Sequence, residues 1–186
     1  MRRILDTVYG AGLVAACAAM VMIAVLVGVQ ILGRIADRTA LWLGLDPFGI
    51  TVPGLSQIGG FLFVAAAMLA LPATLRSGGH VRVTLLSGAL RGLAGRIAAV
   101  LVLAAALALA VFAAWQSGLQ ALDSWQFNTR SFGMIRAPLW IPQGVMTLGL
   151  GLLVVAVLDE LVAVLRGQPA AYQEAEAARS TENGGH

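Results

Sequence analysis

The sequence predicts an all-α integral membrane protein with four transmembrane helices. The chain has 186 residues, of which 59% are apolar and only 11% are charged. A soluble domain of average composition has about 25% charged residues, and so small a chain could not otherwise cover its surface with polar groups. Four uncharged stretches each exceed the roughly 20 residues that a helix needs to cross a bilayer. The apolar runs are continuous rather than alternating, which excludes the strands of a membrane barrel.

The first two spans are predicted at Val8–Leu32 and Gly54–Leu75. The first lies in the uncharged stretch that separates Asp6 from Arg34. The second follows Asp46, and its helix is expected to begin only after the prolines and glycines that precede it, because these residues favour turns.

The connection after the second span is predicted to contain a short amphipathic helix at residues 83–95. Leu86, Leu90 and Leu93 repeat at helical spacing, whereas Arg91 falls on another face. Such a helix lies in the membrane interface with its arginines toward the lipid headgroups.

The last two spans are predicted at Ile97–Ala121 and Pro138–Leu161, again between charged residues. Residues 1–166 therefore form one four-span membrane domain. Residues 167–186 are polar and small, and they are predicted to form a mobile cytoplasmic tail.

The arginines predict the orientation. If both termini lie on one side of the membrane, that side holds eight arginines and the other side holds four, namely Arg34, Arg38, Arg130 and Arg136. Positive residues favour the cytoplasm. Both termini are therefore predicted to be cytoplasmic.

The sequence offers no catalytic constellation, so an enzyme is not expected. The predicted spans hold no ionisable residue at their centres, although such residues are kept where a membrane protein moves ions or substrate. His80 and His186 lie outside the spans and Cys17 is the only cysteine, so no cofactor or metal is expected. The sequence has no basic stripe with interleaved aromatic residues, so nucleic acid is not expected as a partner.

The polar and small residues of the spans are interpreted as packing residues. The polar side chains near mid-span are expected to hydrogen-bond between helices; they are Gln57, Thr74, Gln116, Ser117, Gln120 and Thr147. Alanine stripes at four-residue spacing predict close helix packing and a larger membrane partner; they are Ala11/Ala15/Ala19, Ala66/Ala70, Ala104/Ala108 and Ala110/Ala114. Two function classes stay open: an accessory scaffold of a larger transporter, and a self-contained four-helix channel or small exporter acting as a homo-oligomer.

Three motifs carry a resemblance to a known family. After the second span the chain reads Arg-Ser-Gly-Gly-His-Val-Arg-Val-Thr-Leu-Leu from Arg76 to Leu86. Before the fourth span, Ser131 leads to Pro-Leu-Trp at Pro138–Trp140 and then to Gly149, and the first span ends in Gln-Ile-Leu-Gly-Arg at Arg34. Over residues 5–165 the chain resembles the small membrane subunit of tripartite ATP-independent periplasmic (TRAP) transporters.

The chain departs from the family pattern at several positions. Ser56 and Gln57 stand where the family often has two acidic residues, and Thr84 stands in place of an aspartate. Gln143 and Thr147 fall at the family's tyrosine and proline in the fourth span.

The resemblance implies a function that the residues alone do not. Such subunits pair with a large membrane subunit that carries the substrate and sodium sites, and a periplasmic binding protein delivers an organic acid to the pair. The small subunit is then part of the static scaffold in the bacterial inner membrane and contributes to docking of the binding protein.

Two sets of candidate site residues follow. The first set is expected at structural or subunit interfaces, with Arg82 and Arg91 also near anionic lipids; it comprises Gly78, Gly79, His80, Arg82, Arg91, Pro138 and Trp140. The second set is expected to dock the binding protein, because arginine is prominent in protein interfaces; it comprises Arg130 as the main candidate, with Arg34 and Arg38.

Overall fold

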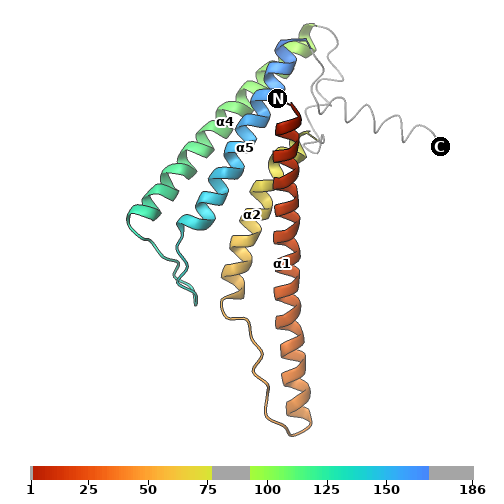
Figure 1. The fold of residues 1–186 in the computed structure, drawn as a ribbon, viewed down its shortest axis with the longest axis vertical. Coiled ribbons are helices and arrows are strands. Elements are labelled where there is room, and N and C mark those ends of the chain that lie inside the picture. The colour runs from red at the N-terminus through yellow and green to blue at the C-terminus, as the bar shows by residue number, and fades with distance from the viewer. Residues whose placement is uncertain (1, 77–92, 168–186) are drawn as a thin grey trace, which may run out of the picture.

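A computed structural model describes residues 2–76 and 93–167. Four long helices make up most of this part of the chain (Figure 1). They are α1 (Arg2–Trp42), α2 (Leu55–Arg76), α4 (Leu93–Gln126) and α5 (Trp140–Leu165). Each is long and apolar enough to cross a membrane. The predicted all-α fold with four membrane spans is therefore confirmed.

Every helix end differs from the predicted span, by one residue at each end of α2 and by four or more residues at one end at least of each other helix. α1 continues beyond Leu32 as far as Trp42, α4 begins at Leu93, and α5 begins at Trp140. The amphipathic helix predicted at 83–95 lies outside the described residues, apart from its last three residues, which belong to α4.

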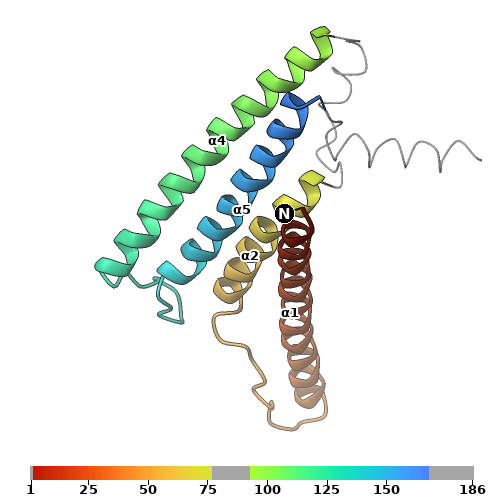
Figure 2. The same cartoon turned by 45° about the horizontal axis from the view of Figure 1, so that its top comes forward.

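The helices form an open row rather than a closed bundle. α1 packs against α2, α2 against α5, and α5 against α4, as two views of the molecule show (Figures 1 and 2). α2 and α5 thus occupy the middle of the row, and α1 and α4 its edges. Large apolar side chains such as Val14 on α1 and Leu109 on α4 are exposed. Lipid or another membrane protein must cover these faces.

The α1–α2 and α2–α5 contacts are close because small residues line them. Ala16 and Ala19 of α1 pack on Ala66 of α2. A Cβ atom built on Gly149 of α5 would lie 2.6 Å from the carbonyl carbon and oxygen of Met68, closer than two non-bonded atoms can approach. Glycine is therefore required where α5 crosses α2.

The alanine stripes predicted the helix faces only in part. Ala19, Ala66 and Ala110 are buried as expected. Ala11 and Ala15 are exposed, because α1 packs through the neighbouring face that carries Ala16. Ala104 and Ala108 are exposed on α4.

The α4–α5 contact combines an apolar cluster with hydrogen bonds. Ala99, Leu103, Val157 and Val164 form the buried cluster. Farther along, the Ser117 and Thr147 hydroxyls lie 2.8 Å apart, and the Thr147 hydroxyl also donates to the Gln143 carbonyl at 2.8 Å. The predicted hydrogen bonding between helices is confirmed for Ser117 and Thr147.

Candidate functional site

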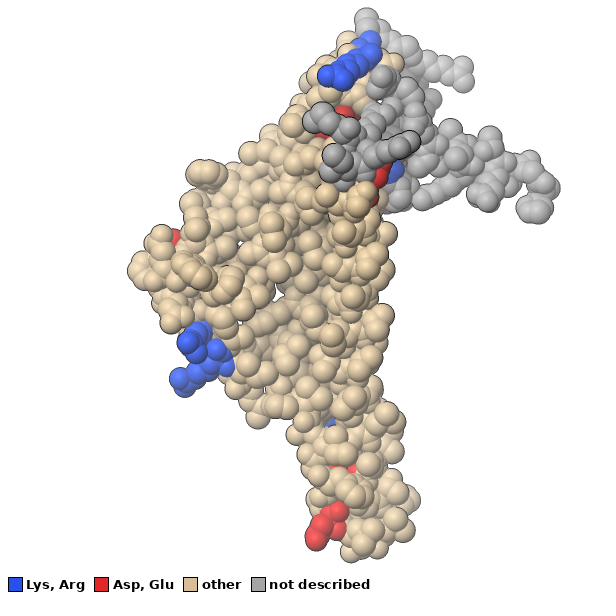
Figure 3. Space-filling model, in the orientation of Figure 1, with Lys and Arg blue, Asp and Glu red and all other residues tan. Residues whose placement is uncertain are grey.

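The charged residues of the described chain lie toward the two ends of the helix row, and the middle of the face in Figure 3 carries none. We call the end that holds Asp6, Arg76 and Asp159 the terminal end. The opposite end, which holds the connections 43–54 and 127–139, is the loop end. A charge-free middle is typical of helices that cross a bilayer, because ionised side chains are costly in lipid.

At the terminal end, Arg76 joins three helices. It is the last residue of α2, and its guanidinium pairs with Asp6 of α1 and with Asp159 of α5, the latter at 3.4 Å. The same group lies 5.4 Å from the centroid of the Tyr9 ring, within the range of a cation–π contact. The Arg76 side chain is only 15% exposed. We call this set (Asp6, Tyr9, Arg76 and Asp159) the arginine clamp.

The surroundings of the arginine clamp are tightly packed. Tyr9 is 3% exposed and Glu160 is 2% exposed. Nearby, the Arg96 guanidinium of α4 donates to the Leu165 carbonyl at 2.6 Å, which satisfies one of the carbonyls that a helix C-terminus leaves without an internal partner. The terminal end is therefore held together by side-chain contacts across all four helices.

The clamp lies directly before the motif that carried the family resemblance. Arg76 is the first residue of that motif, whereas Gly78, Gly79, His80, Arg82 and Arg91 lie outside the described residues. Arg76 was placed in the family motif but was not included among the candidate site residues predicted from the sequence. A usable signal was present, because Asp6, Arg76 and Asp159 each border an uncharged stretch on the same predicted side.

At the loop end, the connection between α4 and α5 folds onto the start of α2. It is closed by backbone bonds from the Ser131 amide to the Ala137 carbonyl (2.9 Å) and from the Leu139 amide to the Thr129 carbonyl (3.0 Å). The Gln57 side-chain amide then donates to the Ile135 carbonyl at 2.6 Å. An ionised glutamate at this position could not donate that bond, so the amide of Gln57 has a local structural role.

Pro138 and Trp140 lie where this connection enters α5. Pro138 forms an isolated antiparallel bridge with Arg130. The Trp140 ring packs edge to face on Trp125 of α4, with ring centroids 4.8 Å apart and an interplanar angle of 81°. Pro138 therefore holds the two sides of the α4–α5 connection together, and Trp140 packs the start of α5 on α4.

The three arginines predicted to dock a partner all lie exposed at the loop end. Arg130 is in the α4–α5 connection, whereas Arg34 and Arg38 are on the last part of α1. In both cartoon views the loop end of α1 lies apart from the α4–α5 connection (Figures 1 and 2). The candidates therefore occupy two separate elements.

The described residues contain no group of histidine, cysteine, aspartate and glutamate side chains that could hold a metal ion. Comparison with curated proteins and with solved structures found no match.

The family model described as "Tripartite ATP-independent periplasmic transporters, DctQ component" matches residues 23–167. This is a family of transporter components, not of enzymes, and the match covers most of the chain, including α2, α4 and α5 entirely. The chain therefore belongs to the DctQ family, the small membrane component of TRAP transporters.

Proposed function

We propose that this protein is the static scaffold subunit of a TRAP transporter that takes up an organic acid together with sodium. In this role it pairs with the large membrane subunit in the bacterial inner membrane and helps to dock the periplasmic binding protein. Family membership supports the complex, and the resemblance in sequence supports the substrate class and the coupling ion.

The observation that carries the scaffold role is the open row of helices with an uncharged middle. Within the described helices, charged side chains occur only toward the ends, so these spans offer no ionisable groups for moving an ion or an acid. The Ser117 and Thr147 hydroxyls bond each other, and the Thr147 hydroxyl also donates to the α5 backbone. Meanwhile α1 and α4 expose broad apolar faces that suit a membrane partner.

Reconstitution tests this function. Proteoliposomes that contain this subunit and the large subunit are expected to take up an organic acid only when both the binding protein and a sodium gradient are supplied. The large subunit is also expected to co-purify with a tagged copy of this chain. Transport by this chain alone as a homo-oligomer would overturn the proposal and favour a self-contained channel or exporter.

The proposed orientation places both termini in the cytoplasm and the loop end in the periplasm. In a Cys17→Ser background, Phe132→Cys is expected to react with a membrane-impermeant thiol reagent in intact cells, because Phe132 is fully exposed in the α4–α5 connection. Arg166→Cys, at the exposed end of α5, is expected to react only after the cells are opened. The reverse pattern would invert the orientation.

We further propose that Arg130 contributes to docking of the binding protein, with Arg34 and Arg38. Arg130→Glu is expected to raise the half-saturating concentration of binding protein in uptake assays about threefold to tenfold, because exposed charges mainly set association rates. The rate at saturation and the yield of the complex should stay unchanged. Arg166→Glu, at the opposite end of the molecule, is the matched control, and equal curves for both variants would remove Arg130 from the docking surface.

The segment that contains Gly78, Gly79, His80, Arg82 and Arg91 is proposed to contact the large subunit and anionic headgroups. The support is its position: it follows the arginine clamp directly, and the clamp fixes the end of α2 from which this segment leaves. Each basic side chain near anionic lipid adds about 1 kcal/mol of attraction.

A further inference from the structure

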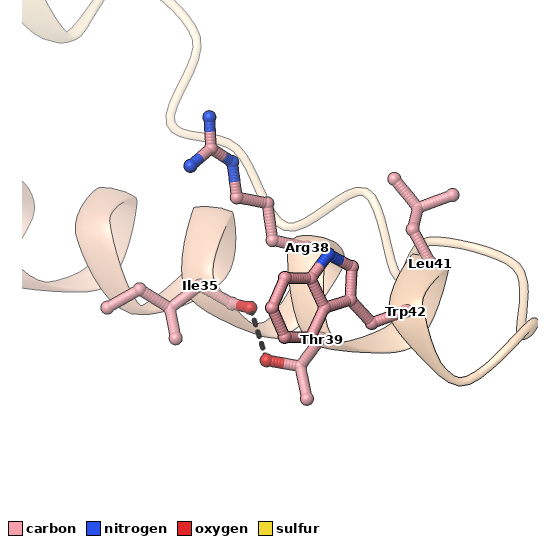
Figure 4. Close-up of a pocket in the computed structure, with 5 residues that line it drawn as sticks. All are labelled: Ile35, Arg38, Thr39, Leu41 and Trp42. Atoms are coloured by element: carbon pink, nitrogen blue, oxygen red, sulfur yellow. Dashed lines mark hydrogen bonds between the residues drawn. The ribbon is translucent and has the colours of Figure 1, made fainter.

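The loop end of α1 carries an apolar groove with an arginine at its edge. Ile35, Arg38, Thr39, Leu41 and Trp42 line this groove, which measures about 400 Å³ (Figure 4). The Trp42 indole lies back along the helix between Arg38 and Thr39, and its residue is 95% exposed. Leu43, Leu45 and Phe48, in the connection that follows, are exposed as well. We call this surface the α1 tip.

The α1 tip is a rigid surface, because the connection after it is fixed along the helix. The Gly49 amide donates to the Asp37 carboxylate at 3.0 Å, and the Val52 amide donates to the Gln30 side-chain oxygen at 2.7 Å. Gly33 lies so close to the Ile50 carbonyl that no larger residue fits there. A preordered surface loses little conformational freedom when it binds a partner.

The length of α1 places its tip outside the hydrocarbon region. With 41 residues, α1 is about 60 Å long at 1.5 Å per residue, whereas the hydrocarbon core is about 30 Å thick. An average tilt of about 20° shortens the projected length by only a few ångströms. Figure 1 shows that α1 projects past the ends of the other three helices at the loop end. Acyl chains therefore do not cover Trp42.

The charges of the tip indicate the chemistry of its occupant. Arg34 and Arg38 are exposed and make no ion pair within residues 2–76 and 93–167. Of the two acidic residues near the tip, Asp37 accepts the Gly49 amide, and Asp46 is exposed in the connection without an ion pair to either arginine among the described residues. An apolar groove with the Arg38 guanidinium at its edge suits an acidic side chain that stands next to an apolar one on the partner.

We propose that the α1 tip is the anchor point of the periplasmic binding protein, with Trp42 inserted between apolar side chains and Arg38 paired with a carboxylate. This proposal rests on the proposed function and deepens it, since it names an apolar anchor on α1 in addition to the arginines. A water-soluble partner fits a surface that stands clear of the membrane, and burial of an exposed tryptophan supplies the affinity that rim charges do not.

Binding of the purified binding protein to the two-subunit membrane complex in nanodiscs tests the proposal. Trp42→Ala is expected to raise the Kd about tenfold or more, whereas Trp42→Phe stays within about threefold of the wild type, since a large aromatic ring is retained. Arg38→Glu is expected to raise the Kd more at low salt than at high salt. Phe63→Ala, which removes an exposed aromatic side chain on α2, is the matched control and should leave the Kd unchanged.

The outcomes separate the two proposals. A wild-type complex that binds no binding protein counts against the proposed function itself. Wild-type binding with an unchanged Kd for Trp42→Ala overturns the α1 tip alone. Loss of the co-purifying large subunit in Trp42→Ala would assign the tip to that subunit, and a changed oligomeric mass with an unchanged Kd would assign it to a second copy; both results overturn the proposal.

Discussion

Replacement of Gly149 with leucine is expected to reduce the yield of monodisperse, detergent-solubilised protein at least severalfold. The leucine Cβ would lie 2.6 Å from the Met68 backbone, so α5 and α2 would have to separate. Overpacking of a close contact costs about 1–3 kcal/mol when side chains can yield, and backbone atoms yield less. Size-exclusion chromatography and thermal stability measure the effect.

Gly151 provides the matched control for this prediction. It lies on the same helix two residues away, and a Cβ atom built on it meets no atom within 4 Å. Gly151→Leu is therefore expected to keep its yield, and Gly149→Ala should lose less than Gly149→Leu. If Gly149→Leu and Gly151→Leu behaved alike, the close approach of α2 and α5 would be wrong.

Removal of the Arg76 guanidinium is the second large effect expected. Arg76→Gln leaves the half-buried Asp159 carboxylate without its charged partner, and loss of a hydrogen bond between charged groups costs about 1.5–3 kcal/mol. For a chain of this size, that loss corresponds to a fall in Tm of about 3–12 °C. Thermal unfolding in detergent measures it. Asp159→Asn should destabilise more than Asp6→Asn, because the Asp6 side chain is 58% exposed and water screens its charge.

Two comparisons show whether the arginine clamp causes that loss. Arg166→Gln removes an exposed arginine near the same end and should leave Tm unchanged. The exchange of Arg76→Asp with Asp159→Arg should recover part of the stability lost in Arg76→Asp alone. A lower Tm in Arg166→Gln, or no recovery in the exchanged pair, would contradict a specific clamp.

The cost of charge in lipid made the positions of the four spans predictable from the sequence. It did not make the contacts between the helices predictable. Charge-free runs such as residues 97–122 mark spans directly, because charges are costly in lipid. The faces that meet other helices and the faces that meet lipid are both apolar, however, so sequence patterns give little sign of which alanine is buried. The predicted stripe through Ala15 is exposed, and the neighbouring Ala16 packs on α2.

The candidate site was predictable to a similar degree. Arg34, Arg38 and Arg130 lie at the same end of the row, as the number of spans between them predicts, but on separate elements; their role in docking stays a prediction. The pairing of Arg76 with Asp6 and Asp159 joins residues far apart in the chain. These ion pairs can be predicted only when α2 is known to lie between α1 and α5. The bond from Gln57 to Ile135 depends in the same way on a fold of the α4–α5 connection that no local pattern encodes.

The order of the helices in space bears on how the protein is made. Neighbours along the row are also neighbours in the chain for α1–α2 and for α4–α5, whereas α2 and α5 are not consecutive. Each hairpin can therefore assemble as it leaves the translocon, but the α2–α5 contact must wait until α5 has been synthesised. Until then, the α2 surface around Met68 that receives Gly149 is uncovered in the bilayer. During that interval, another helix with a small-residue face could pack against this α2 surface in place of α5.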